Sequence, residues 1–121
     1  MSLVLIHSRL AMTVVMFSFA LGAWGLVNYF RGQGITSSYW GALVIGELVA
    51  LVQALLGVII FITVRPPSDL LHLLSGALVG LVWPGVYVYT HSRAGRAEML
   101  WYALASLFIF GLGLRAMTTG G

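Results

Sequence analysis

Four long apolar runs, separated by short polar stretches, make up almost the whole chain of 121 residues. A helix needs about 20 consecutive apolar residues to cross the hydrocarbon core of a bilayer. The runs therefore predict four transmembrane helices, at about residues 3–30, 41–64, 69–90 and 99–117. The fully apolar part of the first helix begins at Leu10.

The polar stretches between the runs predict where each helix ends. Residues 31–38 contain two glycines and the run Thr36-Ser37-Ser38, which we expect to form a loop. Tyr39 and Trp40 follow, and such aromatic side chains are typical of the belt at a membrane–water interface. Pro66 and Pro67 stop the second helix, because the proline ring cannot continue it.

The third helix has its own start signal. Ser68 is the expected N-cap, and the carboxylate of Asp69 is favourable in the first turn. Short connectors of this kind join antiparallel neighbours. The predicted fold is therefore an all-α integral membrane protein, an up-down-up-down four-helix transmembrane bundle, with residues 1–121 in one domain.

Composition agrees with a membrane protein and excludes several kinds of site. The chain is 60% hydrophobic and 7% charged, with a mean hydropathy of +1.02, which no soluble domain of this size has. It contains no cysteine, which excludes disulfides, thiolate metal sites, covalently attached heme and iron–sulfur clusters. All the basic residues are arginines scattered along the chain, so no basic stripe predicts nucleic-acid binding.

The arginines bear on orientation in the cell membrane. In the predicted bundle one end carries Arg9, Arg65 and Arg115, and the other carries Arg31, Arg93 and Arg96. The count is equal, but the second set lies in loops, whereas Arg9 and Arg115 lie inside helical segments. Positive loops favour the cytoplasm, so we expect both termini on the outer, periplasmic face.

Two histidines open parallel helices. His7 begins the first apolar run and His72 the third, so in this topology both lie at a similar depth at one end of the bundle. Two axial ligands of a heme need that arrangement. His91 lies about 28 Å further along the third helix at 1.5 Å per residue, and we expect it in a loop.

Glycines follow His72 at helical spacing. Gly76 and Gly80 lie one and two turns further along the same face, which leaves a stretch of helix without side-chain bulk. A flat macrocycle bound by His72 would need such a surface. The alternative is a face of small residues that packs against another helix, which is common in membranes.

Charge at the histidine end fits the same hypothesis. Three arginines at this end, Arg9, Arg65 and Arg115, outnumber its single acidic residue, Asp69. The two propionates of a heme prefer arginine as a partner. The alternative is that each arginine extends separately to the lipid headgroups.

Two polar side chains lie inside the second run. Gln53 shares a stripe with Gly46, Ala50 and Gly57, so we expect it to face the bundle and join helices. Glu47 is a candidate proton or quinone contact, but we favour an ion pair with an arginine at the Arg31 end. No zinc-protease, Walker, Rossmann or nucleophile–base motif is present, so no enzyme class is predicted.

The middle of the chain resembles the heme A synthase family. The resemblance rests on Gln53-Ala54-Leu55-Leu56-Gly57-Val58-Ile59-Ile60, the turn at Pro66-Pro67, and Leu70-Leu71-His72-Leu73-Leu74-Ser75-Gly76. His7-Ser8-Arg9 is similar to that family's partner ligand, a histidine followed by arginine, with one residue inserted. The resemblance implies a four-helix half with heme-ligating histidines toward the outer face.

The chain departs from that family in two ways. It corresponds to one four-helix half, whereas the family has two such halves. No acidic residue precedes His7, where the family carries a glutamate tied to its chemistry. The resemblance therefore implies a heme-binding bundle and not heme A synthesis.

The sequence leads to two functional hypotheses. The first is a small cytochrome b-like protein that binds heme b through His7 and His72, beside Gly76, and transfers electrons. Its partners would be the lipid bilayer and a redox protein or the subunits of a larger respiratory or photosynthetic complex. The second is a cofactor-free structural or accessory subunit of a membrane complex.

Overall fold

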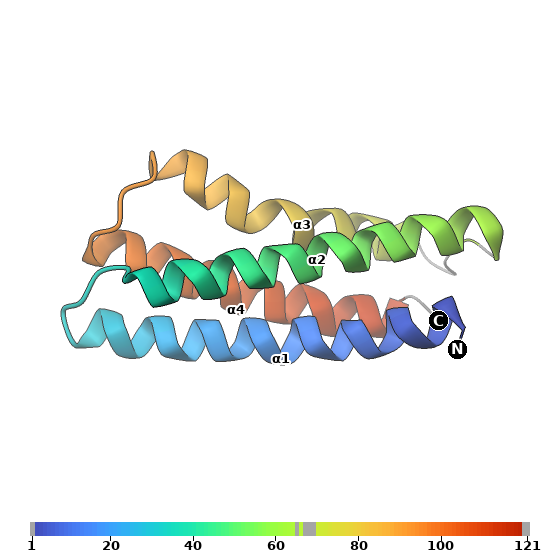
Figure 1. The fold of residues 1–121 in the computed structure, drawn as a ribbon, viewed down its shortest axis with the longest axis horizontal. Coiled ribbons are helices and arrows are strands. Elements are labelled where there is room, and N and C mark those ends of the chain that lie inside the picture. Colours follow the sequence, from blue (N-terminus) through green and yellow to red (C-terminus); the bar gives the residue numbers. More distant parts are fainter. Residues whose placement is uncertain (1, 65, 67–69, 120–121) are drawn as a thin grey trace.

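The computed structural model describes residues 2–64, 66 and 70–119. Within them the chain forms four helices, which run alternately up and down (Figure 1): α1 (Leu3–Phe30), α2 (Ser37–Thr63), α3 (Leu70–Tyr89) and α4 (Arg96–Thr119). No strand occurs in these ranges. All four helices are long and apolar enough to cross a membrane. The predicted all-α four-helix bundle, with α1 and α3 parallel, is confirmed.

Two helices begin earlier than predicted. Helix α2 starts at Ser37 rather than 41, because the Thr36 hydroxyl caps it by accepting a hydrogen bond from the Tyr39 amide at 3.2 Å. The loop predicted at residues 31–38 therefore ends at Thr36, and the prediction is wrong for Ser37 and Ser38. Helix α4 starts at Arg96 because Glu98 Oε1 accepts a hydrogen bond from the Gly95 amide at 3.0 Å. The caps predicted at Ser68 and Asp69 lie outside the described residues.

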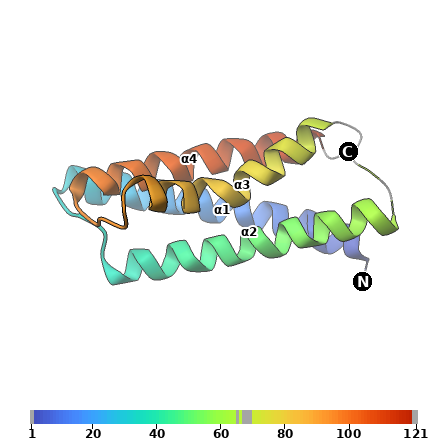
Figure 2. The ribbon, with the colours of Figure 1, turned by 90° about the horizontal axis from the view of Figure 1, so that it is seen from above.

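The tightest contact in the bundle joins α1 to α4. Gly22 and Gly25 of α1 face Leu107 and Ala103 of α4. A methyl group added at Gly25 would lie 2.8 Å from Ala103 Cβ, so only glycine lets the two backbones approach this closely. Helices α1 and α3 lie diagonally opposite, and α2 and α3 share the smallest contact of any neighbouring pair (Figure 2).

Tyr39 belongs to the core rather than to an aromatic belt. Its side chain is fully buried, and its hydroxyl donates a hydrogen bond to the Leu21 carbonyl at 2.8 Å. Its ring also packs edge-on against Trp24, with the ring centres 4.9 Å apart. Tyr39 therefore does not face outward as a belt residue would, because a hydrogen bond to the α1 backbone satisfies the one polar atom of this side chain inside the bundle.

A buried hydrogen bond between side chains joins α3 to α4. The indole Nε1 of Trp83 donates a hydrogen bond to the Ser106 hydroxyl at 3.0 Å, and Ser106 donates in turn to the Tyr102 carbonyl at 2.7 Å. Both side chains are buried. Helix α4 is thus held to α1 by close packing and to α3 by a polar contact.

The α1–α4 contact predicts an asymmetric response to added bulk. Gly25→Leu should force the two helices apart and lower the free energy of unfolding by about 1–3 kcal/mol. Gly41→Leu is the matched control, because a side chain there meets no atom within 4 Å. Thermal unfolding in detergent, followed by circular dichroism, measures both. Equal midpoints for the two variants would refute the role given to Gly25.

Candidate functional site

A cavity of about 640 Å³ lies at the end of the bundle where α1 and α3 begin and α2 and α4 end (Figure 1). All four helices contribute to its wall, which is mostly aliphatic. Its size falls within the range of about 300–1,000 Å³ that is usual for sites that bind small molecules and cofactors.

His7 and His72 lie together on the wall of this cavity. Their ring centres are 6.1 Å apart and the ring planes meet at 72°. His7 is in the second turn of α1 and His72 in the first turn of α3, so the parallel course of these helices brings the rings to one depth. The structure thus joins the two histidines that the sequence singled out.

A backbone contact fixes the tautomer of His72. Its Nδ1 lies 2.9 Å from the carbonyl oxygen of Ala116 in α4. A carbonyl only accepts hydrogen bonds, so Nδ1 carries the proton and, in the neutral ring, Nε2 keeps a free lone pair. Histidines that bind metals are usually oriented by a bond of this kind through the other nitrogen.

Helix α2 holds His7 from the other side. The Gln53 amide nitrogen donates a hydrogen bond to the His7 carbonyl at 2.8 Å. A methyl group added at Gly57 would lie 3.3 Å from His7 Cε1, so the ring packs close to the α2 backbone. The prediction that Gln53 faces the interior and joins helices is confirmed.

Two polar atoms beside the cavity have no hydrogen-bond partner among the described residues. They are Nδ1 of His7 and Oε1 of Gln53, and both are buried. An unpaired buried polar atom costs about 1–3 kcal/mol. A donor or acceptor bound in the cavity would relieve that cost.

The face that follows His72 is open. Gly76 lines the cavity one turn beyond His72, and an added methyl group there would meet no atom within 4 Å among the described residues. Gly80 is equally open but lies off the cavity wall. Among the described residues no helix packs against these two glycines, so the alternative of a small-residue packing face is not realised within this bundle.

Arg9 and Arg115, two of the three arginines predicted to bind propionates, are not on the wall. Arg9 and Arg115 are exposed, and the cavity is lined instead by their neighbours Ser8, Ala116 and Met117. Arg65 lies outside the described residues. A role for these arginines therefore stays a prediction.

The ion pair predicted for Glu47 is wrong. Arg93 lies 3.8 Å from Glu98, and Arg96 donates to the Tyr29 carbonyl at 2.8 Å and covers its ring. Oε1 of Glu47 is buried with no hydrogen-bond partner among the described residues. Ten residues separate Glu47 from the start of α2, which is about 15 Å, so the arginines at that end are out of reach.

His91 lies far from the cavity. It follows the end of α3 in an exposed turn and has a positive φ of 52°. The prediction that His91 is a loop residue is confirmed.

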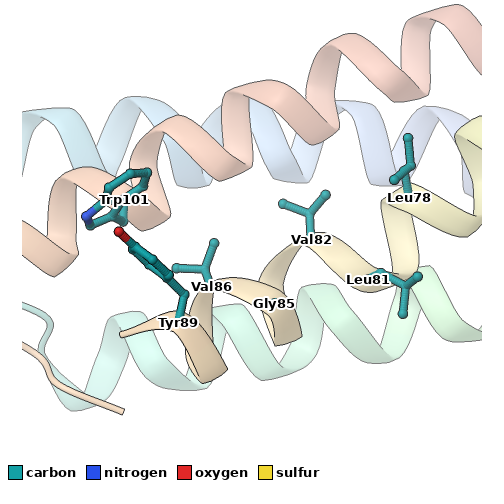
Figure 3. Close-up of a pocket in the computed structure, with 7 residues that line it drawn as sticks. All are labelled: Leu78, Leu81, Val82, Gly85, Val86, Tyr89 and Trp101. Carbon is teal, nitrogen blue, oxygen red and sulfur yellow. The ribbon is translucent and has the colours of Figure 1, made fainter. Parts of the chain in front are cut away.

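A second hollow lies between α3 and α4 toward the opposite end (Figure 3). Glycine at position 85 makes room for it, and Tyr89 and Trp101 meet at its edge with ring centres 5.2 Å apart. Its wall is aliphatic and aromatic, with no acid, base or histidine. The histidine cavity is therefore the candidate site.

The donor set at the histidine cavity limits the chemistry. No group of three or more metal-binding side chains of the His, Cys, Asp or Glu type occurs in the part of the chain that the structure describes. A protein site for zinc needs three or four ligands. Two imidazoles suit a metal that brings most of its own ligands, as the iron of a porphyrin does.

Comparison with family models, with curated proteins and with solved structures found no match. The function is therefore argued from the geometry of the site alone.

Proposed function

We propose that this protein is a small membrane cytochrome b-like protein that binds one heme b between His7 and His72 and transfers electrons. The observation that carries the proposal is the separation of the two rings, 6.1 Å between centres. Two metal–nitrogen bonds of about 2 Å each, with about 1.1 Å from each nitrogen to its ring centre, give about 6 Å when both nitrogens point at one metal between the rings.

The cavity fits this occupant in shape and polarity. Its wall is largely aliphatic, and Gly76 leaves a flat, open face beside His72. The bond from Nδ1 to Ala116 leaves the Nε2 lone pair of His72 available for a metal. These features support a planar, apolar cofactor that needs axial nitrogen ligands and little else.

The ligand pair favours electron transfer over oxygen chemistry. Heme supplies reversible one-electron redox chemistry when it is bound. His7 and His72 would occupy both axial positions, which leaves none for oxygen or substrate. The residues of this chain then hold and orient the group and exclude water, and the proposal includes no enzymatic step.

Location and partners follow from the placement of the site. The four apolar helices are compatible with a multi-pass protein of the cell membrane. We propose that the termini and the histidine end face outward, since Arg31 and Arg93 lie in connectors at the other end. A site at one end of the bundle needs a partner to pass electrons on, either a redox protein or neighbouring subunits of a larger complex.

Loss of either ligand should abolish binding. His72→Ala and His7→Ala should each lose most of the heme absorbance, because a single axial ligand retains a non-covalent heme poorly. His91→Ala is the matched control, since His91 lies in an exposed turn at the other end of the bundle. Absorbance spectra of the oxidised and reduced purified proteins measure the result.

Two outcomes would end the heme proposal. One is an unchanged spectrum in His72→Ala, and the other is a wild-type protein that binds no heme. In the second case the cofactor-free accessory subunit becomes the better hypothesis.

Bulk at the open face should block the cofactor without harming the fold. Gly76→Leu adds a side chain where no atom lies within 4 Å, so the stability of the heme-free protein should stay the same while heme content falls. Gly80→Leu is equally open but off the cavity wall, and should keep its heme. Heme per protein and the thermal midpoint are measured for both. Normal heme content in Gly76→Leu would contradict the binding mode.

Charge near the site should set the redox potential. Arg9→Gln removes a positive charge two residues after His7, which should favour the oxidised form and lower the midpoint potential. Arg31→Gln removes the same charge at the far end of α1 and should leave the potential unchanged. Potentiometric titration in nanodiscs compares them. An equal shift in both variants would mean that Arg9 has no special relation to the site.

A further inference from the structure

The histidine cavity is open on one side of the bundle. On α2 and α3, five residues that line the cavity are exposed: Ala54, Val58 and Phe61 on α2, and Leu73 and Ala77 on α3. Within each helix they follow one another at intervals of three or four residues, so each set forms a single edge. These two edges form an apolar rim between α2 and α3.

The cavity is closed toward the middle of the bundle. Val14 on α1, Ala50 on α2, Val79 on α3 and Gly113 on α4 also line it, and all four are buried. Gly113 lies against Val15, where an added methyl group would come within 2.7 Å of a Val15 methyl carbon. The middle of the bundle therefore offers no passage.

The helix arrangement accounts for the opening. Helix α1 packs most extensively on α4, whereas α2 and α3 share the smallest contact of any neighbouring pair. Figure 2 shows α2 lying apart from α3 near the chain termini. The side of the bundle with the least packing is thus the side on which the cavity wall is exposed.

The rim has the chemistry of a surface that faces lipid. All five of its side chains are apolar, and none carries a charge or a hydrogen-bonding group. Ala54 lies nine residues before the end of α2, about 13 Å inside the helix, which is hydrocarbon depth for a spanning helix. An aqueous entrance would have to pass the exposed Ser8 and Met117 at the terminal end instead.

We infer that the cavity opens sideways into the bilayer between α2 and α3, and that its flat, apolar ligand enters and leaves through the hydrocarbon phase. The inference rests on the proposed function in taking this cavity as the binding site. It adds the route, and with it the class of ligand that can arrive: a molecule that partitions into lipid.

The chain suits a direct test of the opening. It has no cysteine, so Gly76→Cys introduces a single thiol on the cavity wall, at a position with room for a nitroxide label. In nanodiscs, power-saturation electron paramagnetic resonance measures collisions of the label with oxygen, which concentrates in hydrocarbon, and with a water-soluble nickel chelate. We expect strong relaxation by oxygen and weak relaxation by nickel.

Closing the rim should remove the oxygen effect. Ala54→Trp together with Ala77→Trp adds bulk to both edges, and the label should lose most of its oxygen accessibility. Ala20→Trp together with Ala23→Trp is the matched control, because both alanines are exposed on α1 and lie off the cavity wall. That pair should leave the label unchanged.

The outcomes separate this inference from the heme proposal. Relaxation by nickel as strong as by oxygen, or oxygen accessibility that survives the Ala54 and Ala77 substitutions, would overturn the sideways opening. If labelled Gly76→Cys does not fold, Ala11→Cys on the α1 wall gives a second label position for the same measurement. Failure of the wild-type protein to bind added hemin would overturn only the heme proposal, since the label reports the opening without heme.

Discussion

The close approach of α1 to α4 is the constraint on which the site depends. Gly22 and Gly25 bring the two backbones together, and α4 then carries both the contact to α1 and the Ala116 carbonyl that orients His72. Helix α4 thus positions both histidines. It packs against α1, which carries His7, and its Ala116 carbonyl accepts a hydrogen bond from His72. In lipid the hydrophobic effect does not drive helices together, because the surrounding chains are as apolar as the side chains. Close packing of this kind drives their association instead.

The cavity lies on the side of the bundle where the helices pack least closely. Where α1 and α4 are joined by glycine, α2 and α3 are left apart, and small residues such as Ala50, Gly57 and Gly76 line the space between. The space is open between α2 and α3, so lipid or a bound molecule can fill it and it need not stay empty.

The sequence predicts the helices and the histidine pair because both follow from simple rules. The lengths of the apolar runs predict four membrane-spanning helices. Because successive helices alternate in direction, the first and third are parallel, and this places His7 and His72 at the same end. Gln53 was predicted to face inward because glycine and alanine share its stripe, and its bond to the His7 carbonyl agrees.

The remaining features of the site lack such a signal. The partner of His72 is the backbone carbonyl of Ala116. Every residue has such a carbonyl, so the sequence cannot show which one accepts the hydrogen bond. Tyr39 resembles an interfacial tyrosine until its hydrogen bond to Leu21 is seen. The Thr36 cap could have been found, since threonine just before a helical run is a known start signal.

Unpaired polar atoms give the strongest reason to regard the cavity as functional rather than as a packing defect. Within hydrocarbon a polar atom without a partner costs several kcal/mol. This chain instead places the buried Oε1 of Gln53 and Nδ1 of His7 beside a cavity that apolar side chains could have filled. A fold that needed only to pack four helices would gain stability by closing this space. A cavity beside two histidines, one of them held with a free Nε2 lone pair, supports the proposed binding site over a cofactor-free scaffold.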